Sequence, residues 1–186
     1  MNQQLASLLA QLERAQARLD RLGDLVPDDR WSTRRDPSSW SVAECVAHLN
    51  LTSEAYIPRI QKAIEQARGL PRKTDGRYGR DTLGWLFGKL VGPLPKIGKA
   101  RIGKVKTTPA FVPAGDFPKS QLLAEFKRLQ LELMRLVREC DGLQIDKVKI
   151  TSPFGEKIQY NCYSALVLLP RHEERHLQQA ELVWSE

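Results

Sequence analysis

Residues 159–184 read QYNCYSALVLLPRHEERHLQQAELVW. Within this stretch Ala165, Leu169, His172 and His176 follow one another at intervals of three or four, the spacing of one face of an α-helix. We therefore expect a helix over 159–184 that turns both histidines toward a core. Residues four apart on a helix have Cβ atoms about 6 Å apart, so the two imidazoles can reach one metal ion.

Three further stretches keep the same helical period, at 2–22, 41–68 and 118–140. The second begins at Ser41, and Glu44 three residues later completes the pattern of a capping box, in which each side chain bonds the other residue's backbone N–H. Four amphipathic helices can bury their apolar faces only against one another. The sequence therefore predicts an all-α protein, a four-helix bundle.

The connection between the second and third of these helices is long. Residues 69–118 are rich in Gly, Pro and Lys, and an apolar patch at 83–94 is expected to form one short helix within this crossover. A short extended stretch is expected at 148–151, followed by a turn at 152–155. We expect residues 1–186 to form a single domain, because the length suits one hydrophobic core.

Composition narrows the class of protein. The chain is 41% hydrophobic and 27% charged, and it has neither a basic start leading into an apolar run nor an apolar stretch of membrane-spanning length. We expect a soluble, cytoplasmic protein. Cys45, Cys140 and Cys162 are odd in number and have no CxxC spacing, so they are expected to be free thiols in the core.

The only other histidine, His48, lies on the second predicted helix beside an apolar stripe that includes Cys45 and Leu49. A single histidine on a helix is usually a buried side chain with a hydrogen-bond partner. Three histidines that face one core instead favour a metal site, and three imidazoles leave a fourth position open. An open position is typical of catalytic rather than structural metal sites.

Three motifs resemble the DinB-like superfamily over nearly the whole chain: Trp40-Ser-Val-Ala-Glu-Cys-Val-Ala-His48-Leu, Ser152-Pro-Phe-Gly and His172-x-x-x-His176-Leu-x-Gln. The resemblance implies a four-helix bundle with a histidine triad, in which His48, His172 and His176 correspond to the nickel or zinc ligands. Relatives with known activity include thiol transferases and a mycothiol-dependent maleylpyruvate isomerase. Many members have no assigned reaction.

Residues and resemblance together favour a metal-dependent enzyme of the thiol S-transferase or hydrolase type, with one divalent transition metal, nickel or zinc, as cofactor. Its partner would be a small-molecule substrate such as a low-molecular-weight thiol, and exposed bundle faces are compatible with a homodimer. Glu44, one turn before His48, is the candidate catalytic residue for proton handling. Its competing role in the capping box is the one we favour.

His172, Glu173 and His176 also match HExxH, the signature of zinc proteases. Those enzymes usually take a third ligand downstream, but only ten residues follow His176 and none is a histidine. We therefore favour the histidine triad over a peptidase site.

Residues 69–119 support a second interpretation. They carry eleven Lys and Arg against three Asp, so this segment accounts for the net charge of +7. Basic and aromatic side chains interleave there, a mixture that can bind nucleic acid or an anionic membrane, or attract an anionic cosubstrate. The alternative is a solvated connection without a ligand. The basic residues are Arg72, Lys73, Arg77, Arg80, Lys89, Lys96, Lys99, Arg101, Lys104, Lys106 and Lys119.

Overall fold

The computed structural model describes residues 1–74, 76–92, 96–97, 100–101, 107–115 and 118–185. Its described residues are mostly helical, with two short antiparallel hairpins, β1–β2 and β3–β4. The elements are α1 (Gln3–Leu25), α2 (Asp28–Trp31), α3 (Val42–Arg68), α4 (Thr82–Val91), β1 (Lys96–Ile97), β2 (Ala100–Arg101), η1 (Pro109–Phe111), α5 (Lys119–Glu139), β3 (Lys149–Thr151), β4 (Gln159–Asn161) and α6 (Cys162–Ser185).

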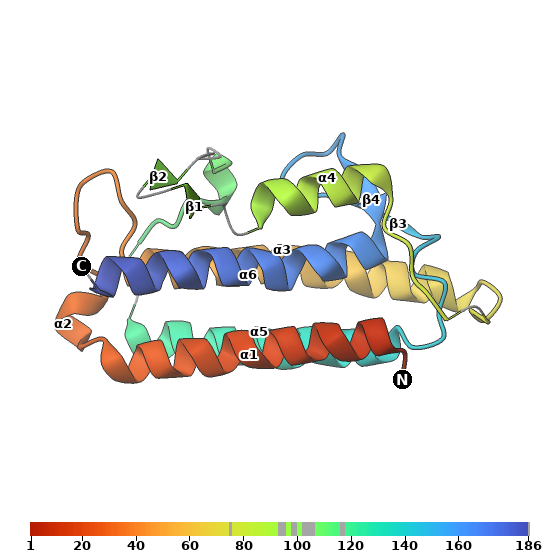
Figure 1. Cartoon of the computed structure of the whole chain (residues 1–186), viewed down its shortest axis with the longest axis horizontal. Helices are drawn as coiled ribbons and strands as arrows, with labels where there is room; N and C mark the ends of the chain where they lie inside the picture. Colours follow the sequence, from red (N-terminus) through yellow and green to blue (C-terminus); the bar gives the residue numbers. More distant parts are fainter. Residues whose placement is uncertain (75, 93–95, 98–99, 102–106, 116–117, 186) are drawn as a thin grey trace.

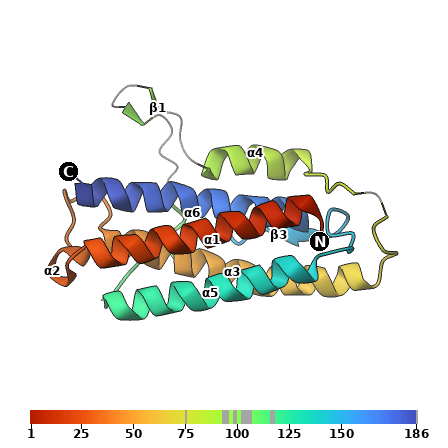
Figure 2. The same ribbon diagram turned by 60° about the horizontal axis from the view of Figure 1, so that its bottom comes forward.

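Four long helices form the predicted bundle, in which α1 and α3 each pack against both α5 and α6. Figures 1 and 2 show that α1 and α6 run in one direction and that α3 and α5 run in the other. Because α3 and α5 are parallel, the chain has to return along the whole bundle between them. This return is the predicted crossover, and α4, within it, lies on the outside of the bundle against α6.

The basic crossover is described only in part. Lys99, Lys104 and Lys106 lie outside the described residues, and of Lys96 and Arg101 only the backbone is described. The expectation that Lys99, Arg101, Lys104 and Lys106 attract an anionic cosubstrate therefore stays a prediction.

The start of α3 confirms the capping box. The Ser41 hydroxyl accepts the N–H of Glu44 at 3.2 Å, and the Glu44 carboxylate accepts the N–H of Ser41 at 2.9 Å. These bonds satisfy two N–H groups that the first helical turn leaves without partners. They also fix where the helix begins, and this sets the rotation that turns Cys45, His48 and Thr52 into the core.

The predicted start of the fourth long helix was wrong by three residues. Residues 159–161 form the strand β4, which pairs with β3 so that Ile150 faces Tyr160. Tyr160 is fully buried, and the Asn161 side chain accepts the N–H of Ser164 at 2.8 Å, which caps the first turn of α6. The buried aromatic residue and the capping asparagine make Cys162 the first residue of the helix, although the helical period of the sequence begins before it.

The carboxylate of Asp81 links α4 to the start of α6 through hydrogen bonds. It accepts the N–H of Gly84, the hydroxyl of Ser164 at 2.9 Å and the N–H of Asn161 at 3.0 Å. The two helices approach so closely that a Cβ built at Gly84 would lie 2.3 Å from the Cβ of Ser164. Glycine is therefore required at this position.

Gly84→Ala is expected to lower the free energy of unfolding by about 1–3 kcal/mol, because the added methyl group must push the helices apart. Gly88→Ala is the matched control on the same helix, since a Cβ there meets only the flexible end of Arg80 at 3.9 Å. It should be neutral or stabilise by up to about 1 kcal/mol through helix propensity. Urea unfolding measures both, and equal effects would contradict a close approach at Gly84.

The core consists of two hydrophobic clusters, one toward each end of the bundle. On α6 the first cluster ends at Leu169 and the second begins at Leu177. The buried polar residues His172, Glu173 and His176 occupy the interval. The bundle therefore contains an internal polar layer, and this layer is where a functional site has to be sought.

Two expectations from composition can be compared with the structure. Cys45, Cys140 and Cys162 are fully buried and form no disulfide, as predicted. None of the helices in the described ranges combines the length and the hydropathy needed to cross a bilayer.

Candidate metal centre

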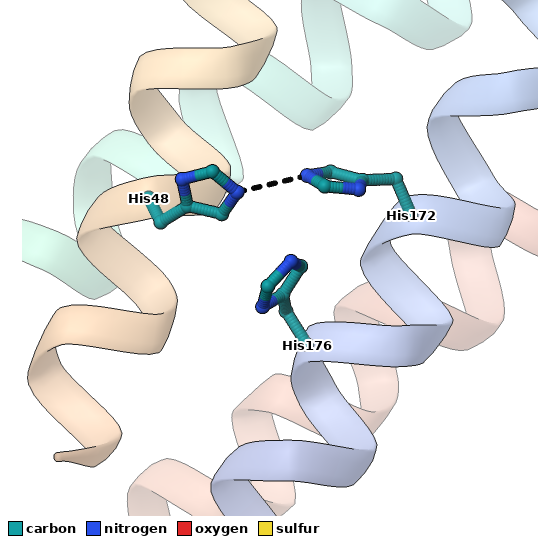
Figure 3. A group of neighbouring side chains, drawn as sticks. All are labelled: His48, His172 and His176. Carbon is teal, nitrogen blue, oxygen red and sulfur yellow. Dashed lines mark hydrogen bonds between the residues drawn. The ribbon is translucent and has the colours of Figure 1, made fainter. Parts of the chain in front are cut away.

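The structure brings the three predicted histidines together. His48 projects from α3, and His172 and His176 project from successive turns of α6, so that the three rings point toward one another (Figure 3). Nε2 of His48 lies 3.0 Å from Nε2 of His172. One ring nitrogen from each histidine lies within 4.8 Å of the other two.

Burial keeps the three imidazoles neutral. His48 is 2% exposed, His172 6% and His176 7%. Desolvation lowers the pKa of His48. It lowers the pKa of His172 to about 3, with a smaller electrostatic contribution from the neighbouring His48. It also lowers the pKa of His176 well below 6.5. Metal ions bind the neutral form of histidine. The cluster is therefore in the ligating protonation state at neutral pH.

A backbone carbonyl of the crossover fixes the orientation of His48. Nδ1 of His48 lies 2.8 Å from the carbonyl oxygen of Phe111 in η1. A carbonyl oxygen can only accept a hydrogen bond, so Nδ1 carries the proton and Nε2 presents its lone pair to the other histidines. Metal-binding histidines are commonly held in this way by a second hydrogen bond.

The other two histidines have a polar atom without a partner. Nδ1 of His172 and Nδ1 of His176 are buried and form no well-aligned hydrogen bond with the described residues. The Val91 carbonyl is a neighbour of His172, and the Gln179 side chain is a neighbour of His176. A ligand on Nε2 would leave the proton on Nδ1, where these two groups are the available acceptors.

The spacing of the nitrogens fits a small ion. Two nitrogens bound to one tetrahedral zinc ion at about 2.0–2.1 Å lie roughly 3.3 Å apart. The 3.0 Å separation of His48 and His172 and the 4.8 Å limit for the whole cluster bracket this value. In the described part of the chain no Cys, Asp or Glu joins the three histidines within that limit. Three imidazoles thus fit a divalent metal and leave its fourth position to a water molecule or a substrate.

Aromatic side chains surround the cluster. Trp40 stacks on His176 with ring centroids 5.8 Å apart and contacts His48 at 5.0 Å. On the other side Phe154 lies 6.2 Å from His172 and 4.6 Å from Phe111. Trp40 and Phe154 belong to the sequence motifs around His48 and in the turn at 152–155, but nothing in their spacing predicted contact with the histidines.

Glu44 lies in the capping box and also binds a cation. Its two carboxylate oxygens accept from the guanidinium of Arg34, one of them from Nε at 2.8 Å. Partial burial raises the pKa of Glu44, but the hydrogen bonds from Arg34 and Ser41 together lower it by more. The resulting pKa is below its ordinary value. The favoured capping role is confirmed. The catalytic role stays a prediction. Both carboxylate oxygens already accept hydrogen bonds from Arg34 or Ser41.

Sequence reasoning missed a buried polar pair outside the histidine cluster, Glu173 and Gln130. Glu173 is 1% exposed, and its carboxylate accepts from Nε2 of Gln130 on α5 at 2.8 Å. Burial raises the pKa of Glu173 to about 8. The side chain therefore reaches α5 and does not join the histidine cluster, which differs from the role of the glutamate in HExxH proteases.

Two cavities of the described structure lie elsewhere. One of about 550 Å³ lies between α1 and the end of α6, and one of about 400 Å³ lies between α3 and α5. None of the three histidines lines either of them. The chemistry of the histidine cluster is therefore separate from both.

The fold and the cluster together define a class of protein, a four-helix bundle with a buried histidine triad compatible with metal binding. Comparison with protein families identifies the particular family: the profile of the DinB superfamily matches residues 11–180, and the chain belongs to this superfamily. No curated protein and no solved structure matches the chain.

Proposed function

We propose that this protein is a metal-dependent enzyme that holds one nickel or zinc ion through His48, His172 and His176 and acts on a low-molecular-weight thiol. The observation that carries the proposal is the cluster of three neutral, buried imidazoles with converging nitrogens. Membership of the DinB superfamily supports it, because the thiol transferases in that superfamily use a triad on corresponding helices. A hydrolase that uses the same triad is the alternative reaction.

The chain supplies two things to such a reaction besides the metal ligands. The Phe111 carbonyl keeps His48 in the ligating tautomer. Trp40 and Phe154 exclude water from two sides of the cluster and offer apolar surface to an electrophile. A divalent metal held by imidazoles supplies a Lewis acid that lowers the pKa of a thiol or a water molecule at the open position.

Thiol consumption tests the proposal. Protein incubated with zinc or nickel should accelerate the loss of a low-molecular-weight thiol in the presence of a generic electrophile. His176→Ala should reduce the catalysed rate at least about 100-fold, because the two remaining imidazoles are too few to hold the ion in place. Gln178→Ala, on the same helix but outside the cluster, is the control and should retain the activity.

Hydrolysis of a simple ester is measured beside thiol consumption. Metal-dependent ester hydrolysis without thiol consumption would select the hydrolase. If neither activity depends on added metal, or if His176→Ala retains either one, the enzyme proposal is wrong.

A further inference from the structure

The outer face of α4 is apolar although it is exposed. Leu83 is 43% exposed, Trp85 42% and Leu86 57%, whereas Gly84 and Gly88 are buried on the side that meets the bundle. Figures 1 and 2 show α4 on the outside of the four-helix bundle. Exposed helix faces normally carry polar residues, and a contiguous apolar patch commonly marks an interaction surface. We call Leu83, Trp85 and Leu86 the α4 outer face.

Basic side chains accompany this face. Nζ of Lys89 lies over the Trp85 ring at 3.9 Å from its centroid. Arg80, directly before the Asp81 cap of α4, is exposed. Arg77 is exposed just before α4, and Arg171 of α6 donates to the carbonyl of Gly88 at 3.3 Å. Positive charge therefore lies at both ends of the helix.

Negative charge is scarce in the same region. Among the described residues of 69–92, Asp81 is the one acidic residue. Its carboxylate is occupied by the N–H groups of Gly84 and Asn161 and by the hydroxyl of Ser164. Within residues 77–89, Arg77, Arg80 and Lys89 therefore outnumber Asp81.

We propose that the α4 outer face docks on an anionic membrane surface. Leucine and tryptophan side chains enter the boundary between headgroups and acyl chains, while arginine and lysine bind lipid phosphates at the level of the headgroups. The apolar and the basic side chains would therefore both form favourable contacts with an anionic membrane. This inference is independent of the metal centre, because none of the three histidines takes part in it.

Other partners use only part of the surface. A nucleic acid would satisfy the basic side chains, but Leu83 and Leu86 gain little from a phosphate backbone, and Trp85 alone gives a single stacking platform. A second copy of the chain would cover the leucines, but it would bring Arg77, Arg80 and Lys89 against the same charges in its partner.

Vesicle flotation of the full chain tests the proposal. Vesicles of phosphatidylcholine with about one third phosphatidylserine should carry the protein to the top of a gradient, and pure phosphatidylcholine vesicles should carry much less. Each basic residue near an anionic surface contributes about fivefold to the partition coefficient. Replacing Arg77, Arg80 and Lys89 by glutamine should therefore reduce binding roughly 100-fold, and 0.5 M salt should weaken the binding of the wild-type chain.

Matched variants separate the α4 outer face from general charge and hydrophobicity. Trp85→Ser with Leu86→Ser should reduce binding at least about tenfold. Leu131→Ser removes a leucine that is equally exposed, at 57%, on α5 and should have no effect. Replacing exposed Lys127, Arg138 and Lys147 by glutamine removes the same charge from another region and should reduce binding much less.

Several results would overturn membrane docking. These are no flotation with anionic vesicles, flotation that the α4 variants do not change, and equal loss in the Lys127, Arg138 and Lys147 variant. Binding to a duplex oligonucleotide with unchanged affinity after Trp85→Ser and Leu86→Ser, together with failure to float, would assign the basic residues to nucleic acid. Dimerisation that these two substitutions abolish, without flotation, would assign the face to a second copy.

Discussion

His172→Ala protein is expected to bind nickel or zinc at least about 100-fold more weakly than the wild-type chain, which should contain about one metal ion per molecule. His172 supplies the nitrogen that lies 3.0 Å from Nε2 of His48, so it joins the α3 and α6 parts of the cluster. Without it, His48 and His176 remain on facing helices with no third donor in the described structure. Two neutral imidazoles hold a divalent ion weakly, because competition from water is then strong.

Elemental analysis by mass spectrometry of protein purified without an affinity tag measures the metal content, and titration against a chelator measures the affinity. Gln178→Ala is the control, because Gln178 lies on the same helix but is not part of the triad. Metal at 100 times the wild-type dissociation constant should also stabilise the wild-type chain by about 2.7 kcal/mol, and His172→Ala by no more than about 0.4 kcal/mol. Wild-type protein that takes up neither nickel nor zinc would contradict a metal centre.

Glu173→Gln is expected to stabilise the metal-free protein. The folded chain raises the pKa of Glu173 to about 8, whereas the ordinary value is 4.5, because burial removes water from the carboxylate. Ionisation therefore favours the unfolded state as the pH rises from 4.5 toward 8. Glutamine carries no charge, and its amide can also donate to Oε1 of Gln130, which has no partner in the described structure.

The gain in the free energy of unfolding should be small below pH 4.5, should grow between pH 4.5 and 8, and should reach the order of 3 kcal/mol at pH 8. Urea unfolding in the presence of a chelator across this pH range measures it. Glu174→Gln, the exposed neighbour paired with Arg18, should change stability by no more than about 0.5 kcal/mol at any of these pH values. A destabilising Glu173→Gln, or a gain that does not depend on pH, would show that Glu173 is not buried as a neutral acid.

The bundle and the triad were predictable because both depend on periodicity. His172 and His176 continue an apolar face, and His48 lies beside another, so the direction of each ring followed from the spacing of leucines and alanines. Burial of three histidines from two helices then required only that the two faces meet, as α3 and α6 do.

The remaining parts of the site depend on contacts that periodicity cannot describe. The Phe111 carbonyl belongs to a backbone 63 residues away from His48, and every residue has a carbonyl, so no pattern of side chains marks it. No pattern in the sequence marked Glu173 as buried, because a charged residue in a helix is normally solvated. Its burial depends on Gln130, a partner on another helix whose orientation becomes known only when the helices have been packed.

The separation of the histidines along the chain has a consequence for the order of folding. His48 and His172 are 124 residues apart, and the crossover and α5 lie between them. Contacts so distant in sequence form late, because the intervening chain must first lose its conformational freedom. The three nitrogens therefore converge only after α6 has docked on α3, and uptake of an ion during refolding would report completion of the bundle rather than its nucleation.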